Sequence, residues 1–239
     1  MVDLLGVTYL THTGVLVEDA PITDLHSVPV DALAPVRVPR SYKGQPHLGG
    51  RYLFAGTGEH VLFESRLEQD ALRFLDHGRA ATHVAAQPLL LKFRVEGKKF
   101  GHYPDFLVDR RPERHLLLNV RTTAYLNTLK AHRAFSAARA LADALGWAYQ
   151  TWSEAPTAQN LNLRFLGGYR FPPYAFDDLA PRLLRACDGP TRLGDLCGRV
   201  SPEALARPVV FHLLWRQDLQ ADLTRPLSNA TLVHPARES

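Results

Sequence analysis

Four segments between Phe63 and Thr122 decide the fold of this chain: FESRLE at 63–68, AQP at 86–88, GHYPDFLV at 101–108 and LLLNVR at 116–121. The first places an acid where a helix is expected to begin. The third opens a strand directly after Pro-Asp, and the last ends an apolar strand in a polar-X-basic triplet. Because strand side chains alternate between faces, positions 119 and 121 are expected to point the same way.

Hydrophobic periodicity predicts the elements around these segments. Apolar residues recur at helical spacing over 64–76, and the run Leu116-Leu117-Leu118 is typical of a strand buried on both faces. Further strands are expected at 51–54, 61–63, 84–93, 106–108, 115–120 and 147–152, and further helices at 125–145 and 158–166. This order predicts an α/β fold, a three-layer α/β/α sandwich with a mixed sheet.

The flanking segments read differently. Residues 1–46 contain a short strand pair and a proline-spaced, extended stretch, so we expect an N-terminal arm laid on the domain at 47–170. Residues 171–239 contain three expected helices, the last opened by Ser201-Pro202, and a terminal hairpin. Three helices followed by a hairpin predict a small winged helix-turn-helix domain.

Composition limits the possible functions. The 239 residues are 46% apolar and 22% charged, and no run of 18 apolar residues occurs, so no membrane span is expected. Two cysteines and an N-terminus without a basic start favour the cytoplasm. The net charge is zero over 171–239 and −2 over 1–46, so the +4 of the whole chain corresponds to +6 over 47–170. A positive central domain favours a polyanionic partner.

The central residues suit metal-dependent phosphodiester cleavage. Mg²⁺ takes hard oxygen ligands, and Mn²⁺ is the alternative ion at such a site. Asp105 at its strand start, Glu64 on the helix beside that strand and Asn119 on the next strand are the expected metal ligands, and Arg121 is expected to stabilise phosphate charge. No organic cofactor is expected.

Six motifs in order resemble the TnsA-like endonuclease subunits of heteromeric transposases over roughly residues 40–170: 63–68, 86–88, 102–106, 120–121, 146–147 and 164–169. The resemblance implies a restriction-endonuclease-like domain of the PD-(D/E)XK type joined to a winged-helix domain. It implies cleavage of double-stranded DNA at the 5′ ends of the transposon, together with a DDE transposase. It also implies an AAA+ regulator that meets residues 171–239.

The match is complete at two positions of the site. Glu64 and Asp105 stand where the family has its acids. Asn119 stands where the motif has an acid or, in some members, an amide, and Arg121 stands where lysine is usual. An amide ligates magnesium without charge, and arginine clamps a phosphate but does not lose its proton near pH 7. Two alternatives therefore stay open: a catalytically degenerate DNA-binding or assembly subunit, and a stand-alone restriction or repair nuclease.

Other polar residues have narrower roles. Arg66, Lys98 and Lys99 are expected to contact DNA, whereas Gln87 and His102 are expected to be structural. A winged helix usually reads DNA with its third helix. Here the zero net charge of 171–239 and the apolar third helix favour docking to a protein, and DNA reading stays the alternative.

Overall fold

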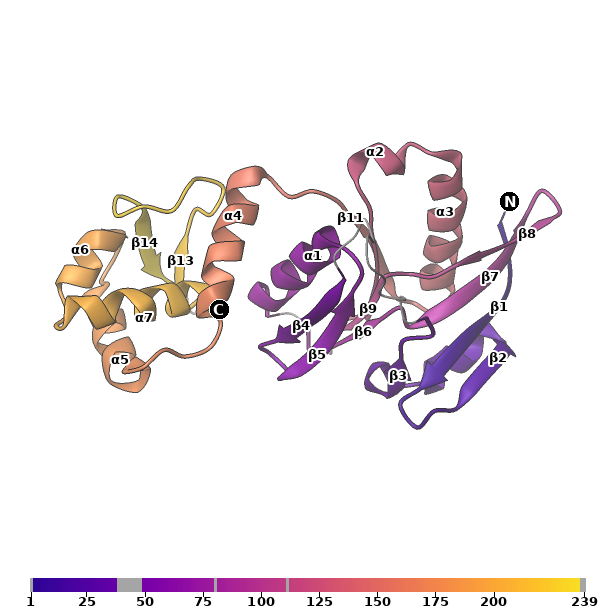
Figure 1. Ribbon diagram of the computed structural model, residues 1–239, viewed down its shortest axis with the longest axis horizontal. Coiled ribbons are helices and arrows are strands. Elements are labelled where there is room, and N and C mark those ends of the chain that lie inside the picture. The colour runs from indigo at the N-terminus through magenta and orange to yellow at the C-terminus, as the bar shows by residue number, and fades with distance from the viewer. Residues whose placement is uncertain (1, 38–48, 80, 111, 237–239) are drawn as a thin grey trace. The chain divides into compact units, whose positions relative to one another are not determined.

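The computed structural model describes residues 2–37, 49–79, 81–110 and 112–236. The chain divides into two compact units. The first comprises Met1–Asp76 and Ala80–Glu154, and the second comprises His77–Arg79 and Ala155–Ser239. Each unit mixes helices with β-sheet, which confirms the predicted α/β class (Figure 1).

A four-stranded mixed sheet lies at the centre of the first unit, in the order β11-β10-β9-β6. Its strands are β6 (His83–Ala86), β9 (Phe106–Asp109), β10 (Leu116–Val120) and β11 (Ala148–Trp152). β10 pairs with β11 in parallel and with β9 antiparallel. Every residue of β9 and β10 is buried, as the apolar runs in the sequence predict.

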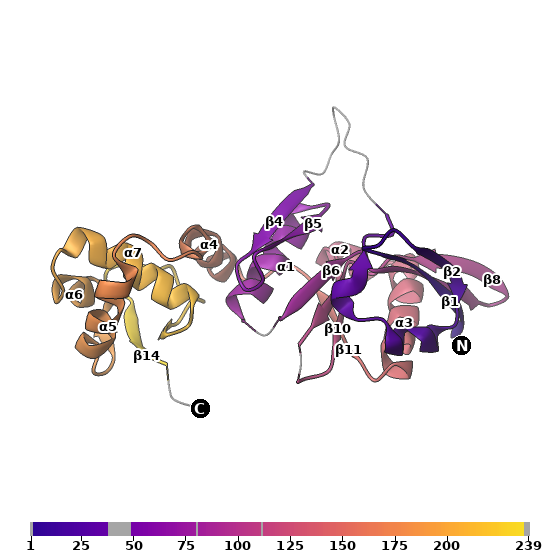
Figure 2. The same cartoon turned by 90° about the horizontal axis from the view of Figure 1, so that it is seen from below.

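Helices cover both faces of this sheet (Figures 1 and 2). Phe106 and Leu118 point into a core shared with α1 (Arg66–His77) and the antiparallel pair β4 (Gly50–Phe54) and β5 (Glu59–Phe63). Leu107 and Leu117 point into the opposite core, which α3 (Leu129–Ala144) covers after the short α2 (Thr123–Leu126). Asn119 follows the odd-numbered alternation of β10, whereas Asp105 directly precedes β9 and Arg121 directly follows β10.

The expected N-terminal arm is wrong for its described residues, 2–37. β1 (Val2–Thr11) pairs antiparallel along its length with β7 (Leu89–Val95), within a sheet ordered β2-β1-β7-β8. The remaining elements of this sheet and its edge are β2 (Leu16–Ala20), η1 (Ile22–Ser27), η2 (Val30–Ala32), β3 (Leu33–Ala34) and β8 (Lys98–His102). The segment is therefore part of the first unit. β1 pairs with residues 80 to 93 positions away, and no local sequence pattern specifies such a partner.

The apolar stretch 84–93 is two strands and not one. β6 and β7 belong to different sheets, and Gln87-Pro88 separates them. Gln87 has a φ of 44°, in the left-handed region that side chains other than glycine rarely adopt. Its backbone is held on both sides, since its N–H donates to the Asp105 carbonyl at 2.8 Å and its carbonyl accepts from the Val36 N–H at 3.1 Å. This bend brings Gln87 beside Asp105.

The second unit has its own apolar core. Its elements are α4 (Thr157–Leu166), η3 (Gly167–Tyr169), α5 (Phe176–Ala186), β12 (Thr191–Arg192), α6 (Leu193–Gly198), α7 (Glu203–Trp215), β13 (Leu219–Ala221) and β14 (Leu232–Pro235). The sheet order is β12-β14-β13. The three helices and the hairpin expected after residue 171 are present.

Helix α4 belongs to the second unit, so the chain divides at Glu154–Ala155 and not at residue 170. The buried Asn162 of α4 donates to the carbonyls of Leu223 and Arg225 at 2.9 and 2.7 Å and accepts from the Leu227 N–H at 3.2 Å.

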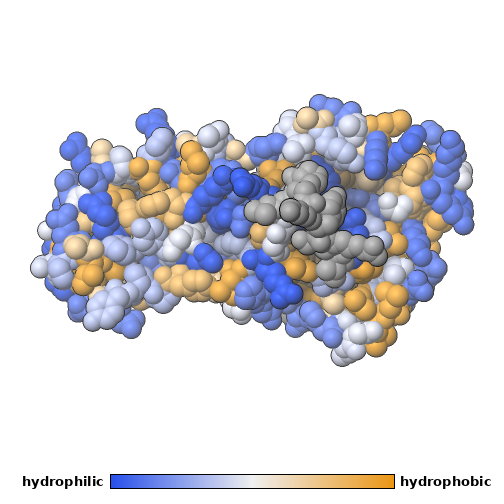
Figure 3. Space-filling view, viewed as in Figure 1, coloured by the Kyte–Doolittle hydropathy of each residue, from blue (hydrophilic) through white to orange (hydrophobic). Residues whose placement is uncertain are grey.

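Polar and apolar side chains intermingle over the face seen in Figure 3. Among the described residues, no helix is long and apolar enough to span a membrane.

Candidate functional site

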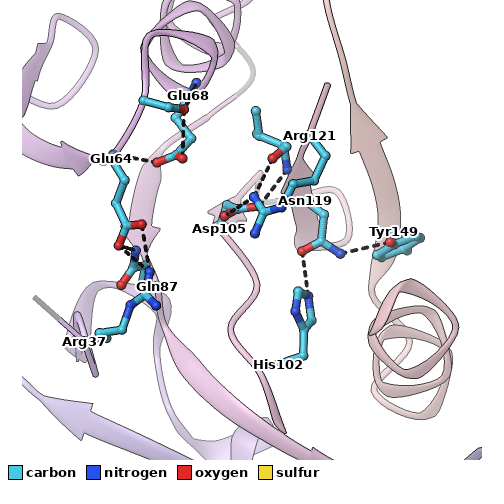
Figure 4. A network of polar contacts seen from close by, with 11 residues as sticks. Arg37, Glu64, Glu68, Gln87, His102, Asp105, Asn119, Arg121 and Tyr149 are labelled. Carbon is cyan, nitrogen blue, oxygen red and sulfur yellow. Dashed lines mark hydrogen bonds and ion pairs between the residues drawn. The ribbon is translucent and has the colours of Figure 1, made fainter. Parts of the chain in front are cut away.

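Asp105 and Arg121 form the centre of the site, at the end of the β9–β10 pair (Figure 4). Arg121 Nη1 lies 2.9 Å from both carboxylate oxygens of Asp105, and the Val120 N–H donates to Asp105 Oδ2 at 2.7 Å. Asp105 is only 6% exposed. Burial raises the pKa of its carboxyl, and the Arg121 charge and the Val120 hydrogen bond oppose that rise. The pair places a held carboxylate and a fixed cation at one sheet edge.

Asn119 is fully buried beside this pair and turns away from it, towards two other side chains (Figure 4). Its amide nitrogen donates to the Tyr149 hydroxyl at 2.9 Å, so its oxygen is the acceptor 3.0 Å from His102 Nε2. Burial lowers the pKa of His102 to about 4, which leaves that imidazole neutral at pH 7. The Asn119 oxygen is thus already engaged, which weakens it as a metal ligand.

Glu64 lies immediately before α1, and not within the helix as the periodicity predicts. Ser65 caps the helix, because its hydroxyl accepts from the Glu68 N–H at 3.1 Å. Glu68 reaches back to the Ser65 hydroxyl at 2.9 Å and to the Glu64 N–H at 2.7 Å, close to a capping box. The sequence Glu-Ser-x-x-Glu therefore fixes two carboxylates at the start of α1.

Arg37 and Gln87 hold the Glu64 carboxylate. Arg37 Nη2 lies 2.7 Å from both of its oxygens, and Gln87 Nε2 donates to Glu64 Oε1 (Figure 4). The other amide atom of Gln87, Oε1, is buried without a hydrogen-bond partner among the described residues. A buried, unsatisfied oxygen in a folded protein usually marks the place of a water or an ion.

A small cavity of ≈ 10 Å³ lies between these groups. Glu64, Glu68, Gln87 and Asp105 all line it, and Arg37 closes one side. Its volume is close to the lower limit for one water molecule or ion. Gln87, whose side-chain oxygen has no hydrogen-bond partner among the described residues, therefore lines a space of the right size for a single bound species.

The donor set around this cavity suits a hard cation. Carboxylate and amide oxygens are the ligands that Mg²⁺ prefers. In the described part of the chain, however, no three His, Cys, Asp or Glu side chains converge as a finished metal site. Arg37 and Arg121 explain this, because each draws one carboxylate to itself. Glu64, Asp105 and Gln87 would hold an ion, with Glu68 beside them, if Arg37 released Glu64 and Arg121 released Asp105.

The expected DNA-contacting residues lie on exposed positions of the first unit. Arg66 is the first residue of α1, directly after the Glu64-Ser65 corner, and its side chain is exposed. Lys98 and Lys99 are exposed at the start of β8, the strand that ends at His102. Of the three, Arg66 alone lies between Glu64 and Glu68 in the chain.

Sequence reasoning missed Arg37 and underrated Gln87 and Glu68. Arg37 belongs to the predicted arm, and its contact with Glu64 spans 27 residues that no periodicity connects. Gln87 carried a usable signal, because a polar residue before proline interrupts an apolar stretch. For Glu68, the Ser-x-x-Glu spacing predicts the cap but not the burial.

Glu68 is expected to make the stability of the metal-free protein depend on pH. Burial, followed by the nearby Asp105 charge, raises the pKa of Glu68 to about 7. The folded protein then binds this proton more tightly than the unfolded chain does, so Glu68 stabilises most at low pH. Its contribution to the unfolding free energy is expected to fall by about 3 kcal/mol between pH 4.5 and 7.

Denaturant unfolding of the wild type and Glu68→Gln between pH 4.5 and 7.5 measures this contribution. Glutamine keeps the capping geometry without titrating. The stability difference between the two proteins should drift across this range in favour of the variant as pH rises. A difference that stays constant with pH contradicts the assignment.

Comparison with known proteins identifies no relative: no family model matches the chain, and no curated protein matches it.

Proposed function

We propose that this chain is a Mg²⁺-dependent DNA endonuclease of the PD-(D/E)XK type. The observation that carries the proposal is the meeting of Glu64, Glu68, Asp105 and Gln87 at one small cavity, with Arg121 bound to Asp105. The layers also fit, since α1 and α3 cover opposite faces of a mixed sheet. Asp105 and Arg121 lie at one end of its two central strands, β9 and β10.

Each residue has a distinct task in this reaction. A divalent ion, when bound, activates a water and offsets charge on the scissile phosphate. Asp105 and Glu64 would hold that ion, and Gln87 would add a neutral oxygen. Arg121 would then be free of Asp105 to contact the phosphate oxygens, for which its planar donors suit bidentate contact. Arg121 takes no proton, because arginine stays charged at neutral pH.

The biological setting we propose is that of a TnsA-like subunit of a heteromeric transposase, which cuts the 5′ ends of a transposon beside a DDE transposase. The second unit is proposed to be a winged-helix domain that meets an AAA+ regulator. Three helices α5, α6 and α7 with the sheet β12-β14-β13 support this arrangement. Seven of the thirteen residues of α7 are buried within the unit, so few side chains of this helix remain to read DNA bases.

A strand-cleavage assay tests the proposal. The chain is incubated with the partner transposase, Mg²⁺ and duplexes that carry the transposon ends, and each strand is labelled separately. We expect scission at the 5′ ends that requires Mg²⁺. Scission that persists in EDTA, or none in any mixture, contradicts the assignment.

A second candidate, a binding subunit without nuclease activity, has one observation in its favour: the Asn119 amide is buried and engaged at both ends. The double variant Asn119→Asp with Arg121→Lys restores the usual acid and lysine. If only this variant cuts, the natural chain is a DNA-binding or assembly subunit.

Arg37 is expected to compete with the metal ion for Glu64. Its guanidinium contacts both carboxylate oxygens, but its side chain is 50% exposed, so the pair is worth less than about 1 kcal/mol. Arg37→Ala should therefore lower the Mg²⁺ concentration that half-saturates thermal stabilisation about threefold. Melting temperature measured across a Mg²⁺ series, without DNA, gives this value.

Arg94→Ala provides the matched control, because it removes a similarly exposed arginine, 42% against 50%, that is paired with Asp3 elsewhere in the same unit. Its Mg²⁺ midpoint should equal that of the wild type. If Arg37→Ala shifts the midpoint no more than Arg94→Ala does, Arg37 does not compete for the ion site.

A further inference from the structure

A second, larger cavity of ≈ 280 Å³ adjoins the candidate site. It shares Arg37, Gln87 and Asp105 with the small cavity and includes Arg121. From there it extends between β8 and the first turns of α3. Whatever fills it lies within reach of the group that binds at Asp105.

The charges around this larger cavity favour an anion. Arg37, Arg121, Lys130 and Arg133 all line it, and Asp105 is the one acidic residue among its described lining residues. Lys130 is exposed at the start of α3. Arg133 has only a loose ion pair, 3.8 Å long, with Glu96, whose side chain is 79% exposed and therefore holds it weakly. Lys130 and Arg133 are thus available to a phosphate.

Aromatic side chains also line this cavity. Phe100, Tyr103, Tyr125 and Phe135 line the cavity and are all half-buried. Cations lie over three of these rings, with Arg133 5.4 Å from the Phe100 centroid, Arg37 5.3 Å from Tyr103 and Arg121 5.9 Å from Tyr125. Cationic and aromatic side chains in one groove are typical of sites that bind unpaired nucleotides, where rings stack on bases and cations contact the backbone.

We propose that this cavity binds one unpaired nucleotide of the cut DNA strand, next to the scissile phosphate. The inference rests on the proposed nuclease function. A stacked base pair is too large for the cavity, so the nucleotide must leave the duplex to enter. Phe93 already stacks on Phe100, so the base takes the place that Arg133 occupies over that ring. Arg133, freed from the ring, and Lys130 contact the phosphate. DNA ends that are already unpaired are the preferred substrate, because they avoid the cost of unpairing.

Binding of two labelled DNAs tests the proposal. One is a blunt duplex, and the other is the same duplex with a three-nucleotide unpaired fork at one end. Fluorescence anisotropy with Ca²⁺ in place of Mg²⁺ is expected to show tighter binding of the fork by the wild type. Phe100→Leu keeps an apolar side chain but removes the stacking ring, so it should weaken fork binding about tenfold and leave blunt binding unchanged.

Two charge variants complete the experiment. Lys130→Ala should weaken fork binding more than Arg114→Ala, which removes an exposed cation at the other end of β10. Equal affinity of the wild type for both DNAs overturns the proposal, as does a fork preference that Phe100→Leu and Lys130→Ala both retain. A cleavage assay that compares the wild type with Asp105→Asn separates the nucleotide-binding proposal from the nuclease proposal. If cleavage that depends on Asp105 persists when the fork preference is absent, only the nucleotide site is wrong; if neither binding nor cleavage occurs, both claims fall.

Discussion

Asp105→Asn is expected to lower the rate of Mg²⁺-dependent cleavage at least about 10³-fold, the effect of losing about 4 kcal/mol of transition-state stabilisation. Asparagine keeps the shape and can still accept the Val120 hydrogen bond, but it gives up the negative charge that the ion requires. Alanine would leave a gap at the buried end of the β9–β10 pair. A loss of cleavage could then come from a folding defect as well as from the missing carboxylate. Single-turnover cleavage rates measured over a range of Mg²⁺ concentrations give the effect.

Asp109→Asn is the matched control. Asp109 is another buried aspartate, 1% exposed, at the far end of β9 from Asp105, where it lies 3.3 Å from His115. Cleavage should survive this substitution. Should Asp105→Asn cut as fast as Asp109→Asn at every Mg²⁺ concentration, the carboxylate of Asp105 is not a metal ligand.

Arg121→Met is expected to lower the free energy of unfolding of the metal-free protein by about 3–5 kcal/mol. Without Arg121, the buried Asp105 carboxylate keeps its hydrogen bond from the Val120 N–H but loses its neighbouring positive charge. A buried charge that is not compensated is costly. The loss should diminish in acid, because a proton can then neutralise Asp105. Denaturant unfolding at pH 7 and pH 5 in EDTA measures both effects.

Two comparisons isolate the cause. Adding Asp105→Asn to Arg121→Met should recover much of the loss, because the unpaired charge is then gone. Lys92→Met breaks the pair with Asp19, whose side chain is 73% exposed, and should cost less than about 1 kcal/mol. A cost for Arg121→Met as small as that for Lys92→Met contradicts the view that Arg121 stabilises a buried charge.

Local sequence pattern was sufficient to predict the helix and strands that lie next to Glu64 and Asp105. The helical stripe after Ser65 and the apolar runs before Asp109 and after His115 predict α1, β9 and β10, which the structure contains. Period-two alternation predicts only that positions 119 and 121 share a face; the contact of Arg121 with Asp105 was not predicted. The predicted features depend on residues close together in sequence, where burial and hydrogen bonding impose a regular period.

The remaining features depend on pairing across long stretches of chain. β1 joins β7 in a register with an irregularity between Leu4 and Gly6, and Gly6 has a φ of 150°. Arg37 reaches Glu64 only because the segment after β3 returns to the site. The division at Glu154–Ala155 follows from Asn162, whose partners lie more than 60 residues later. None of these partners can be identified from spacing alone.

The most direct test of a metal-dependent site is anomalous diffraction from crystals soaked in millimolar Mn²⁺, which scatters where Mg²⁺ would bind. We expect one peak bounded by the carboxylates of Glu64 and Asp105 and by the Gln87 amide oxygen, with Arg37 displaced from Glu64. A map without a peak there, in which Arg37 still holds Glu64 and Arg121 still holds Asp105, would contradict the account.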